Sequence, residues 1–401
     1  MAIYLDNHST TRLDPRVLDA MLPWLTDHYG NAGSTTHEMG REAREAVERS
    51  RESFAAAVGG TAREIVFTSG ATESANLAIL GTASRLPPRN GGPARGRVIT
   101  VQTEHHAVLD PVARLGRSGH AVTLLPVRPH RADDGGPAGT IRLDDLEAAL
   151  GPETFLVSVM LANNEIGVVQ DVAAIAERVH RHGAILHVDC AQAIGRLPVS
   201  VDALGADLAS FSAHKFHGPK GVGALYVRRR GRAVRIDPLV FGGGQERGMR
   251  SGTLDVPGIV GMAAAADLAV ADLPAEASRL RALRDRLWRL LADAIPGVAV
   301  NGPALDDPAV RLVNNLNVRV PGVDGQSLLA TLAGDGLAVS SGSACSSESP
   351  RPSHVLLALG LDEDEARASL RFGLSRFTTD EEIGTAAARV AAGVARLRSL
   401  G

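Results

Sequence analysis

Between about residues 64 and 227 the chain alternates between two hydrophobic patterns. Short runs rich in β-branched and aromatic residues are typical of buried strands, and longer stretches with apolar residues three or four positions apart are typical of helices. The expected strands lie at 64–68, 97–101, 121–126, 155–159, 184–188, 207–211 and 222–227, and helical periodicity is clearest at 72–84, 108–118 and 171–182. Strands separated by helices indicate a mainly parallel sheet that helices cover on both faces.

The pattern changes after about residue 256. The Ala-rich stretch 258–270 is interrupted by Asp267 and is shorter than the roughly 18 to 20 apolar residues that a membrane span needs, so it predicts a buried helix. An Arg-rich amphipathic helix is expected at 274–294, strands at 312–318 and 370–372, and a last helix at 380–397. We therefore expect an α/β fold with a large domain, 15–257, and a smaller α+β domain formed by 1–14 and 258–401.

Composition narrows the class of protein. At 401 residues the chain is long enough for two domains, and its net charge of −3 offers no concentrated positive charge for nucleic acid or an anionic membrane. It has two cysteines, Cys190 and Cys345, too few for a disulfide framework, and its first residues do not read as a secretory signal. These features predict a cytoplasmic protein with a small molecule or another protein as its partner.

Lysine is almost absent from the chain. Of its 42 basic residues only Lys215 and Lys220 are lysines, and both lie in the segment 212–221. Arginine stays protonated, whereas a lysine amine can act as a nucleophile or form a Schiff base. A codon bias toward arginine explains the scarcity of lysine equally well, so the neighbouring residues have to decide between chemistry and chance.

Two charged residues follow adjacent predicted strands. Asp189 comes directly after the strand 184–188, and Lys215 comes after the strand 207–211. In α/β sheets ligands bind outside the carboxyl ends of the strands, so both side chains are expected at one edge. The aspartate could instead cap the next helix. The pair suits a pyridoxal phosphate site, where lysine forms the Schiff base and a carboxylate holds the pyridine nitrogen protonated.

Other strand ends carry compatible groups. The turn 69–73, Ser-Gly-Ala-Thr-Glu, predicts either a phosphate-binding helix start or a simple capping box. No Gly-x-Gly-x-x-Gly or P-loop pattern occurs, which argues against dinucleotides and nucleoside triphosphates. His105 is either a solvated loop residue or a ring that stacks on a planar cofactor, and Asn164 could donate to a ring oxygen or a substrate carboxylate.

Cys345 lies in a run of Ser, Gly and Pro that predicts an exposed loop. A free thiol there is either a reactive group or an incidental surface cysteine. Cys190 adjoins a predicted strand end and is expected to pack in the core. Arg371 could bind a substrate carboxylate in bidentate fashion, with Arg376 as the competing choice.

Taken together, the motifs resemble those of the cysteine desulfurases of the NifS/IscS type, within the class V aminotransferase group. The segments that carry this resemblance are Tyr-Leu-Asp-Asn (4–7), Phe-Thr-Ser-Gly-Ala-Thr-Glu-Ser (67–74), Thr-Glu-His (103–105), Asn-Asn-Glu-Ile-Gly (163–167), His-Val-Asp (187–189), Ser-Ala-His-Lys (212–215), Gly-Met-Arg-Ser-Gly-Thr (248–253) and Ser-Ser-Gly-Ser-Ala-Cys (340–345). They follow the family's order across nearly the whole chain, and the last is similar to the branch with a long cysteine loop.

The resemblance implies a fold-type-I enzyme that uses pyridoxal 5'-phosphate. It implies that Lys215 forms the Schiff base and later abstracts the substrate α-proton, that Asp189 pairs with the pyridine nitrogen, and that His105 stacks on the ring and assists proton transfer. Gln192 would contact the ring hydroxyl, and Asn164 and Arg371 would lie on the side of the substrate carboxylate. The implied phosphate-binding residues are Ala71, Thr72, Ser212, His214 and, from the other subunit of a homodimer, Thr253.

The implied reaction removes sulfur from L-cysteine, which leaves L-alanine and a persulfide on Cys345. The sulfur would pass to an acceptor protein such as an iron–sulfur scaffold or a tRNA-thiolation relay. No resident metal is expected, and Cys345 would meet iron only as a transient ligand of an iron–sulfur cluster. A related class V transaminase or selenocysteine lyase would share the cofactor residues without needing Cys345, and a sulfur-carrier subunit without turnover is a third reading.

Two departures from the family accompany these expectations. The first segment reads Asn7-His8-Ser9-Thr10 rather than the residues that are more common in the family at these positions. The sequence also lacks the longer C-terminal extension of the housekeeping branch. The first is expected to alter packing near the site without replacing a cofactor contact. The second leaves the sulfur acceptor open.

Overall fold

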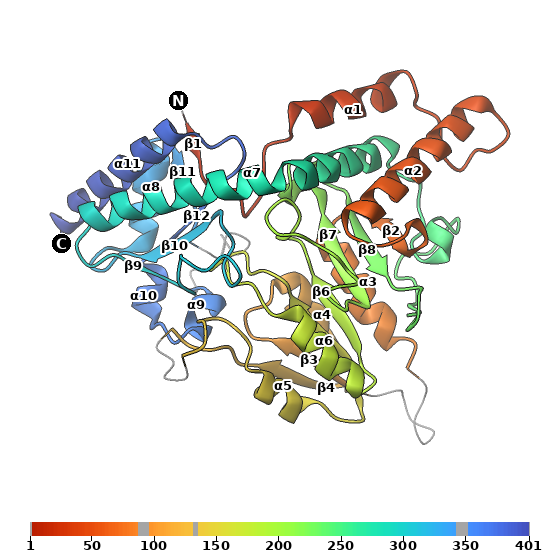
Figure 1. The fold of residues 1–401 in the computed structure, drawn as a ribbon, viewed down its shortest axis with the longest axis horizontal. Coiled ribbons are helices and arrows are strands. Elements are labelled where there is room, and N and C mark those ends of the chain that lie inside the picture. The colour runs from red at the N-terminus through yellow and green to blue at the C-terminus, as the bar shows by residue number, and fades with distance from the viewer. Residues whose placement is uncertain (1, 87–95, 131–134, 342–351, 401) are drawn as a thin grey trace.

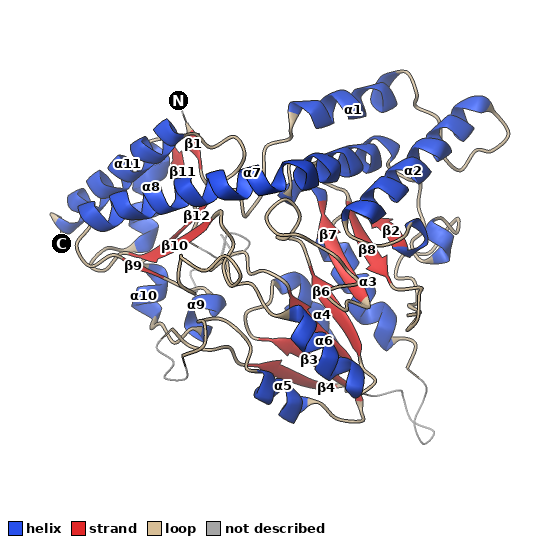
Figure 2. Cartoon of the chain, in the orientation of Figure 1, coloured by secondary structure: helices blue, strands red, loops and turns tan. Residues whose placement is uncertain are grey.

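The computed structural model describes residues 2–86, 96–130, 135–341 and 352–400. Within these residues the centre of the fold is a seven-stranded sheet of order β2-β8-β7-β6-β5-β3-β4 (Figures 1 and 2). The strands are β2 (Ile65–Thr68), β3 (Arg97–Val101), β4 (Ala121–Leu125), β5 (Thr154–Met160), β6 (Ile185–Asp189), β7 (Leu208–Ser212) and β8 (Gly223–Val227). Strand β8 runs antiparallel to both of its neighbours, and the other neighbouring strands pair in parallel. The expected mainly parallel α/β sheet is confirmed.

Helices cover both faces of this sheet. Alternate strand residues point to opposite sides, and both sets are largely apolar, so each face needs a cover. On one face Val98, Leu156 and Leu208 pack with apolar residues of α3 (Ala71–Ala83) and α4 (His106–Arg117). On the other face their neighbours Ile99 and Val157 join a larger core. That core draws on α1 (Pro15–Thr26), α2 (Glu38–Ala57), α5 (Leu143–Ala149), α6 (Val172–Arg181) and the first part of α7 (Val256–Ala294).

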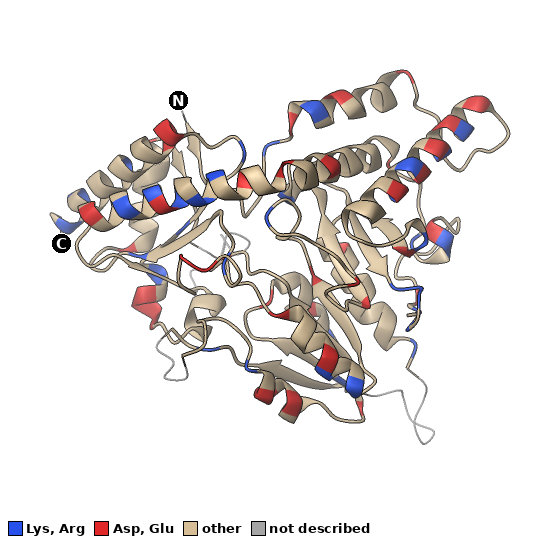
Figure 3. Cartoon of the chain, viewed as in Figure 1, with Lys and Arg blue, Asp and Glu red and all other residues tan. Residues whose placement is uncertain are grey.

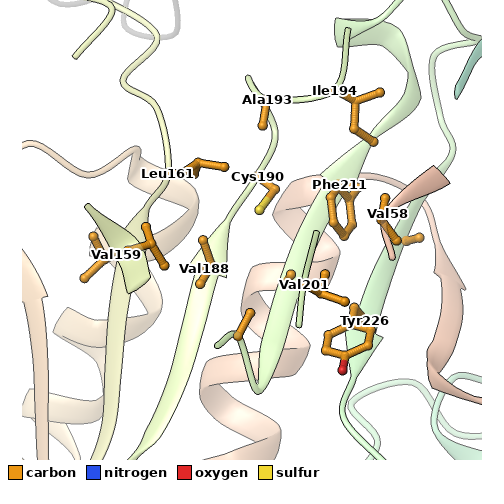
Figure 4. Close-up of a cluster of buried hydrophobic side chains, with 14 of the residues drawn as sticks. Val58, Val159, Leu161, Val188, Cys190, Ala193, Ile194, Val201, Phe211 and Tyr226 are labelled. Atoms are coloured by element: carbon orange, nitrogen blue, oxygen red, sulfur yellow. The ribbon is translucent and has the colours of Figure 1, made fainter. Parts of the chain in front are cut away.

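Cys190 belongs to the larger core. Figure 4 shows its sulfur among apolar side chains that include Val188 and Phe211, and the residue is only 1 % exposed. Burial raises the pKa of the Cys190 thiol well above its ordinary value, with a smaller contribution from Asp189. The side chain therefore packs as a small apolar group, as the sequence indicated.

A second core lies beneath the smaller sheets. Strand β1 (Ile3–Tyr4) pairs in parallel with β11 (Leu337–Ala338), and an antiparallel sheet has the order β12-β10-β9. These three strands are β12 (Ser369–Gly373), β10 (Asn315–Arg319) and β9 (Ala299–Val300), and the helices beside them are α8 (Gly325–Gly334) and α11 (Asp380–Arg398). The start of the chain therefore belongs with its C-terminal part, and both termini lie at one end of the molecule (Figure 1).

Helix α7 joins the two cores. It is a single helix of 39 residues, where the sequence predicted separate helices on either side of Pro274, and that prediction was wrong. Proline cannot donate to the carbonyl one turn earlier, that of Val270, and Val270 is 45 % exposed, so the missing hydrogen bond lies on a solvent-exposed part of the helix. Ile259 and Met262 pack in the larger core, and Leu287 packs in the smaller one. The predicted domain boundary falls at the start of α7, whereas the cores divide within it.

Among the described residues, α7 is also the helix that is long and apolar enough to cross a membrane by length and composition alone. Its most apolar window has a mean hydropathy of 1.6, and half of that window is buried inside the fold. The buried apolar residues of α7 therefore have partners in the two protein cores.

Charge is concentrated outside the central sheet (Figure 3). Of the residues in β2 to β8, only Arg97 and Asp189 are charged. Arg97 opens β3, whereas Asp189 closes β6 at the carboxyl edge. The remaining short elements are η1 (Ala62–Glu64), η2 (Ala213–Lys215), η3 (Glu246–Gly248), α9 (His354–Ala358) and α10 (Glu363–Arg367).

Candidate active site

A cavity of about 740 Å³ opens at the carboxyl edge of the central sheet. Its walls include nearly all of the site residues predicted from the sequence, namely Ala71, Thr72, His105, Asn164, Asp189, Gln192, Ser212, His214, Lys215 and Arg371. Thr253 is exposed and lies away from this wall, and Cys345 lies outside the described residues. Because parallel strands end at one edge, the fold brings together groups that are far apart in sequence.

Asp189 is the last residue of β6 and is almost fully buried. Its Oδ1 accepts a hydrogen bond from the Ala191 backbone N–H at 2.9 Å. Burial raises the pKa of Asp189, and the backbone hydrogen bond and the positive charge of Lys215 partly offset that rise. A desolvated carboxylate of this kind favours a cationic partner inside the cavity.

Lys215 lies on η2, directly after β7. Its Nζ donates to the backbone carbonyls of His8 at 2.6 Å and Ser9 at 2.8 Å. Both acceptors belong to the N-terminal segment, which also lines the cavity. The position of the amine is therefore set by a segment more than 200 residues away in the sequence.

The start of α3 forms one end of the cavity. Its N-cap is Gly70, which has φ +150° and provides no side chain to cap the helix. The carboxylate of Glu73 accepts from the Ser69 N–H at 2.7 Å and pairs with Arg250 at 2.9 Å. A complete capping box is therefore absent from this described turn, and the first N–H groups of α3 face the end of the cavity that Thr72 also lines.

His105 is the N-cap of α4, the helix that follows β3. Its Nδ1 accepts from the Ala107 N–H at 3.0 Å, so the proton of the neutral ring is on Nε2. Burial, with a smaller effect of Lys215, lowers the pKa of His105 to about 4. The ring is therefore uncharged at neutral pH and presents an N–H donor.

The structure distinguishes between the two candidate arginines. Arg371, on β12, lines the cavity and donates to Asp6 Oδ1 at 2.8 Å and to the Asn164 carbonyl at 3.1 Å. Arg376 instead pairs with Asp14 at 3.0 Å and does not line the cavity. Arg371 is the one placed to meet a ligand.

Several residues on the cavity wall had no predicted role, and Glu104, His8 and Lys220 are three of them. Glu104 is fully buried, its Oε1 accepts from the Met160 N–H at 2.7 Å, and its Oε2 has no partner among the described residues. Burial raises the pKa of Glu104 well above its ordinary value. His8 and Lys220 also line the cavity. All three stand inside or beside quoted motifs, but sequence position alone does not show which motif residue faces the ligand.

The residues on either side of the segment 342–351 are tied to the cavity. Ser340 exchanges backbone hydrogen bonds with Arg371, the shorter being 2.6 Å. On the other side Ser353 donates to Glu165 Oε2 at 2.5 Å, and His354 bonds to the Glu104 carbonyl at 3.0 Å. The described residues on both sides of 342–351 therefore contact residues of the site.

Comparisons with known proteins agree with this geometry. Residues 3–385 match the family model described as aminotransferase class-V. The cysteine desulfurase IscS of Anaeromyxobacter dehalogenans is 50 % identical over 400 residues, which cover 99 % of this chain and 94 % of that protein. The human cysteine desulfurase is 46 % identical over 398 residues, covering 99 % of this chain and 83 % of the relative.

A solved structure of a NifS-like protein superposes with a TM-score of 0.88 at 38 % identity and covers 99 % of this chain and all of the other. The expectation drawn from the motifs is therefore confirmed at the level of family and fold. The chain belongs to the class-V aminotransferase family, in which it groups with the cysteine desulfurases.

Proposed function

We propose that this chain is a pyridoxal-phosphate-dependent enzyme that removes sulfur from L-cysteine, leaving L-alanine and a persulfide on Cys345. The observation that carries the proposal is the single cavity in which Lys215, Asp189 and His105 meet beside the uncapped start of α3. A structure of the relative SspA was solved in complex with cysteine, at 35 % identity and a TM-score of 0.78 over 94 % of this chain and 99 % of that one.

The residues present fit the phosphate of the cofactor. The start of α3 offers backbone N–H groups without a capping side chain, and Thr72, Ser212 and His214 add polar side chains to the same wall. A helix N-terminus favours an anion because the helix dipole is positive there. Glu73, the acid in the first turn of α3, is neutralised by Arg250. These residues would hold the phosphate.

The part of the cavity wall that Asp189 forms fits a protonated ring nitrogen. Asp189 is buried with one oxygen engaged by Ala191, and a cation beside the other oxygen would stabilise the desolvated charge. Pyridoxal phosphate, when bound, supplies an electron sink for the carbon next to the substrate amino group. Asp189 would keep the charge that this role requires.

Proton transfer falls to two neighbouring groups. The Lys215 amine is held on the cavity wall by the carbonyls of His8 and Ser9. Once it is neutral, it can take the α-proton. His105 stays uncharged at neutral pH and can donate from Nε2. The substrate carboxylate would be oriented by Asn164 and Arg371, which are already joined to each other at 3.1 Å.

Sulfur transfer needs a nucleophile that reaches the cavity. In the proposed step the Cys345 thiolate attacks the substrate sulfur, an S–S bond forms as the C–S bond breaks, and the carbon takes up a proton to become alanine. Both sides of the segment 342–351 are fixed at the cavity by Ser340 and Ser353. This supports the assignment of Cys345 to that step.

We further propose a cytoplasmic homodimer that passes its sulfur to an acceptor protein such as an iron–sulfur scaffold. Exposed apolar side chains on α1 and just after it support a partner surface, because Leu22 and Leu25 on the helix and Tyr29 beyond its end are 52 %, 56 % and 72 % exposed. Phe241, at 80 %, and Thr253 are exposed in the loop region before α7. In a dimer Thr253 would complete the phosphate site of the second subunit.

The test is a single-turnover assay with L-cysteine and cofactor-loaded enzyme. The expected result is one alanine per active site together with a persulfide that maps to Cys345, and Cys345→Ser should lose the persulfide while keeping the cofactor absorption. Alanine formed at the same rate by Cys345→Ser would contradict the role of this thiol and favour a lyase of another type. Enzyme that binds no cofactor would overturn the whole proposal.

A further inference from the structure

A chain of buried hydrogen bonds links the small domain to the cofactor cavity through His8. At its far end Arg311, fully buried, donates from Nη2 to Asn315 Oδ1 at 2.9 Å. Arginine can only donate, so the Asn315 atom facing it must be oxygen. The amide nitrogen of Asn315 therefore points the other way, toward His8 Nε2 at 3.2 Å and the Glu165 carbonyl at 3.0 Å.

This contact fixes the tautomer of His8. Because an amide N–H faces Nε2, that nitrogen accepts, and the proton of the neutral ring lies on Nδ1. His8 Nδ1 is 3.1 Å from Gln192 Oε1, so it donates there. The ring is 1 % exposed, and burial together with Arg196 and Arg371 holds the pKa of His8 well below its ordinary range. His8 therefore stays neutral.

This series of hydrogen bonds ends at Gln192. Its Oε1 accepts from His8 and from Arg196 Nη1, and its Nε2 donates to the His8 backbone carbonyl at 3.0 Å. Within the described residues this leaves the second N–H of Nε2 for a group inside the cavity that Gln192 lines. The same His8 carbonyl also accepts from Lys215 Nζ.

We propose that His8 is a positioning residue, whose imidazole, donor at Nδ1 and acceptor at Nε2, holds the Gln192 amide with an N–H directed at the ring oxygen of the cofactor. This inference rests on the proposed function. A donor at that oxygen stabilises its anionic form, in which the bound cofactor absorbs visible light, over the hydroxyl form, which absorbs in the near ultraviolet. His8 thereby connects the small domain to the protonation state of the cofactor.

The test compares the ratio of these two absorption bands in cofactor-loaded variants. His8→Leu removes both ring contacts and should lower the visible-to-ultraviolet ratio about three- to tenfold, the range for one hydrogen bond. His8→Asn should keep most of the ratio, because its amide nitrogen can occupy the place of Nδ1. His8→Gln keeps an acceptor near Asn315 but not the donor at Gln192, and should behave like His8→Leu.

The control is His180→Asn, which removes an imidazole bonded to buried Asp207 at 2.9 Å, at the opposite edge of the sheet. It should leave the ratio unchanged. In a Gln192→Leu background, His8→Leu should change the ratio no further, whereas a general packing effect would add. Should His8→Leu fail to fold, His8→Gln and His8→Asn decide.

A wild-type ratio in a folded His8→Leu or His8→Gln variant overturns the inference, as does a larger loss in His8→Asn than in His8→Gln. Wild-type enzyme without any visible band after cofactor addition would instead contradict the proposed function. The two failures are therefore distinguishable.

Discussion

Two buried carboxylates lie in contrasting regions of this molecule. Glu246, beneath α2 and β2, receives both Arg51 nitrogens Nη1 and Nη2 at 2.7 Å and the Phe67 N–H at 2.8 Å, and the Arg51 guanidinium stacks 4.7 Å from the Phe67 ring. Glu104, on the cavity wall, accepts one hydrogen bond from the Met160 N–H. Its other carboxyl oxygen has no partner among the described residues.

The difference separates a structural charge from a group at a functional site. A buried ion pair whose donors and acceptors are all used holds elements together, and removing one partner leaves the other as an unpaired buried charge. A buried acid without a cation keeps its proton instead, and such perturbed groups gather where ligands bind. Each of the following variants tests one side of this contrast.

The largest effect is expected at the cavity, for Lys215→Ala. Loss of the amine removes the Schiff base and the base for the α-proton, so desulfuration should fall by about 10³-fold or more, and the visible cofactor band should disappear. The measurements are alanine formation and absorption spectra. Lys220→Ala changes the other lysine of the chain, also on the cavity wall, and should keep the visible band. A Lys215→Ala enzyme that retains the band would contradict the assignment.

A large effect on stability is expected on the structural side, for Arg51→Met. It leaves the carboxylate of Glu246 buried without its cation, which should lower the free energy of unfolding by about 3–5 kcal/mol. Urea unfolding measures this. Arg49→Met is the matched control on the same helix, because its ion pair with Glu45 is exposed and should cost about 1 kcal/mol or less. Equal losses in the two variants would remove the distinction.

The smallest effect is expected for Glu104→Gln. An amide can accept from Met160 as the protonated acid does, and one neutral group replaces another at the unpartnered oxygen, so stability near pH 5 should change by about 1 kcal/mol or less. Burial raises the pKa of Glu104 in the folded state. At a pH above the ordinary pKa of glutamate, the folded protein therefore binds more protons than the unfolded protein, and its stability falls as pH rises.

The Glu104→Gln variant has no such proton to lose. The free energy of unfolding of the variant, relative to that of wild type, should therefore increase as pH rises from about 5 to 8. Urea unfolding across that range, with and without cofactor, checks the sign. A difference that stays constant with pH would show that Glu104 is ionised throughout, and the contrast with Glu246 would then lose its basis.

Much of this site could be predicted because its residues follow strands. The pattern around β6 and β7 is local, and it places Asp189 at the end of β6 and Lys215 just after β7. The continuity of α7 through Pro274 was missed, because the rule that proline ends a helix gives way where solvent can satisfy the carbonyl. That exposure is a property of the assembled domains.

The roles of Glu104 and His8 were missed for a related reason. Glu104 lies within a family motif and His8 directly follows one, but their chemistry depends on partners elsewhere in the chain. Glu104 meets Met160, 56 positions away, and His8 meets Asn315, 307 positions away. No periodicity in the sequence reports on contacts at such separations.

The sequence by itself determined the α/β architecture, the family and the set of residues at the strand ends, because alternating strands and helices force those ends to one edge. Only the tertiary structure decided that Arg371 rather than Arg376 faces the cavity, that Glu104 is buried without a cation, and that the N-terminal segment holds Lys215. These outcomes depend on burial and on hydrogen bonds between distant segments, which exist only once both cores are packed.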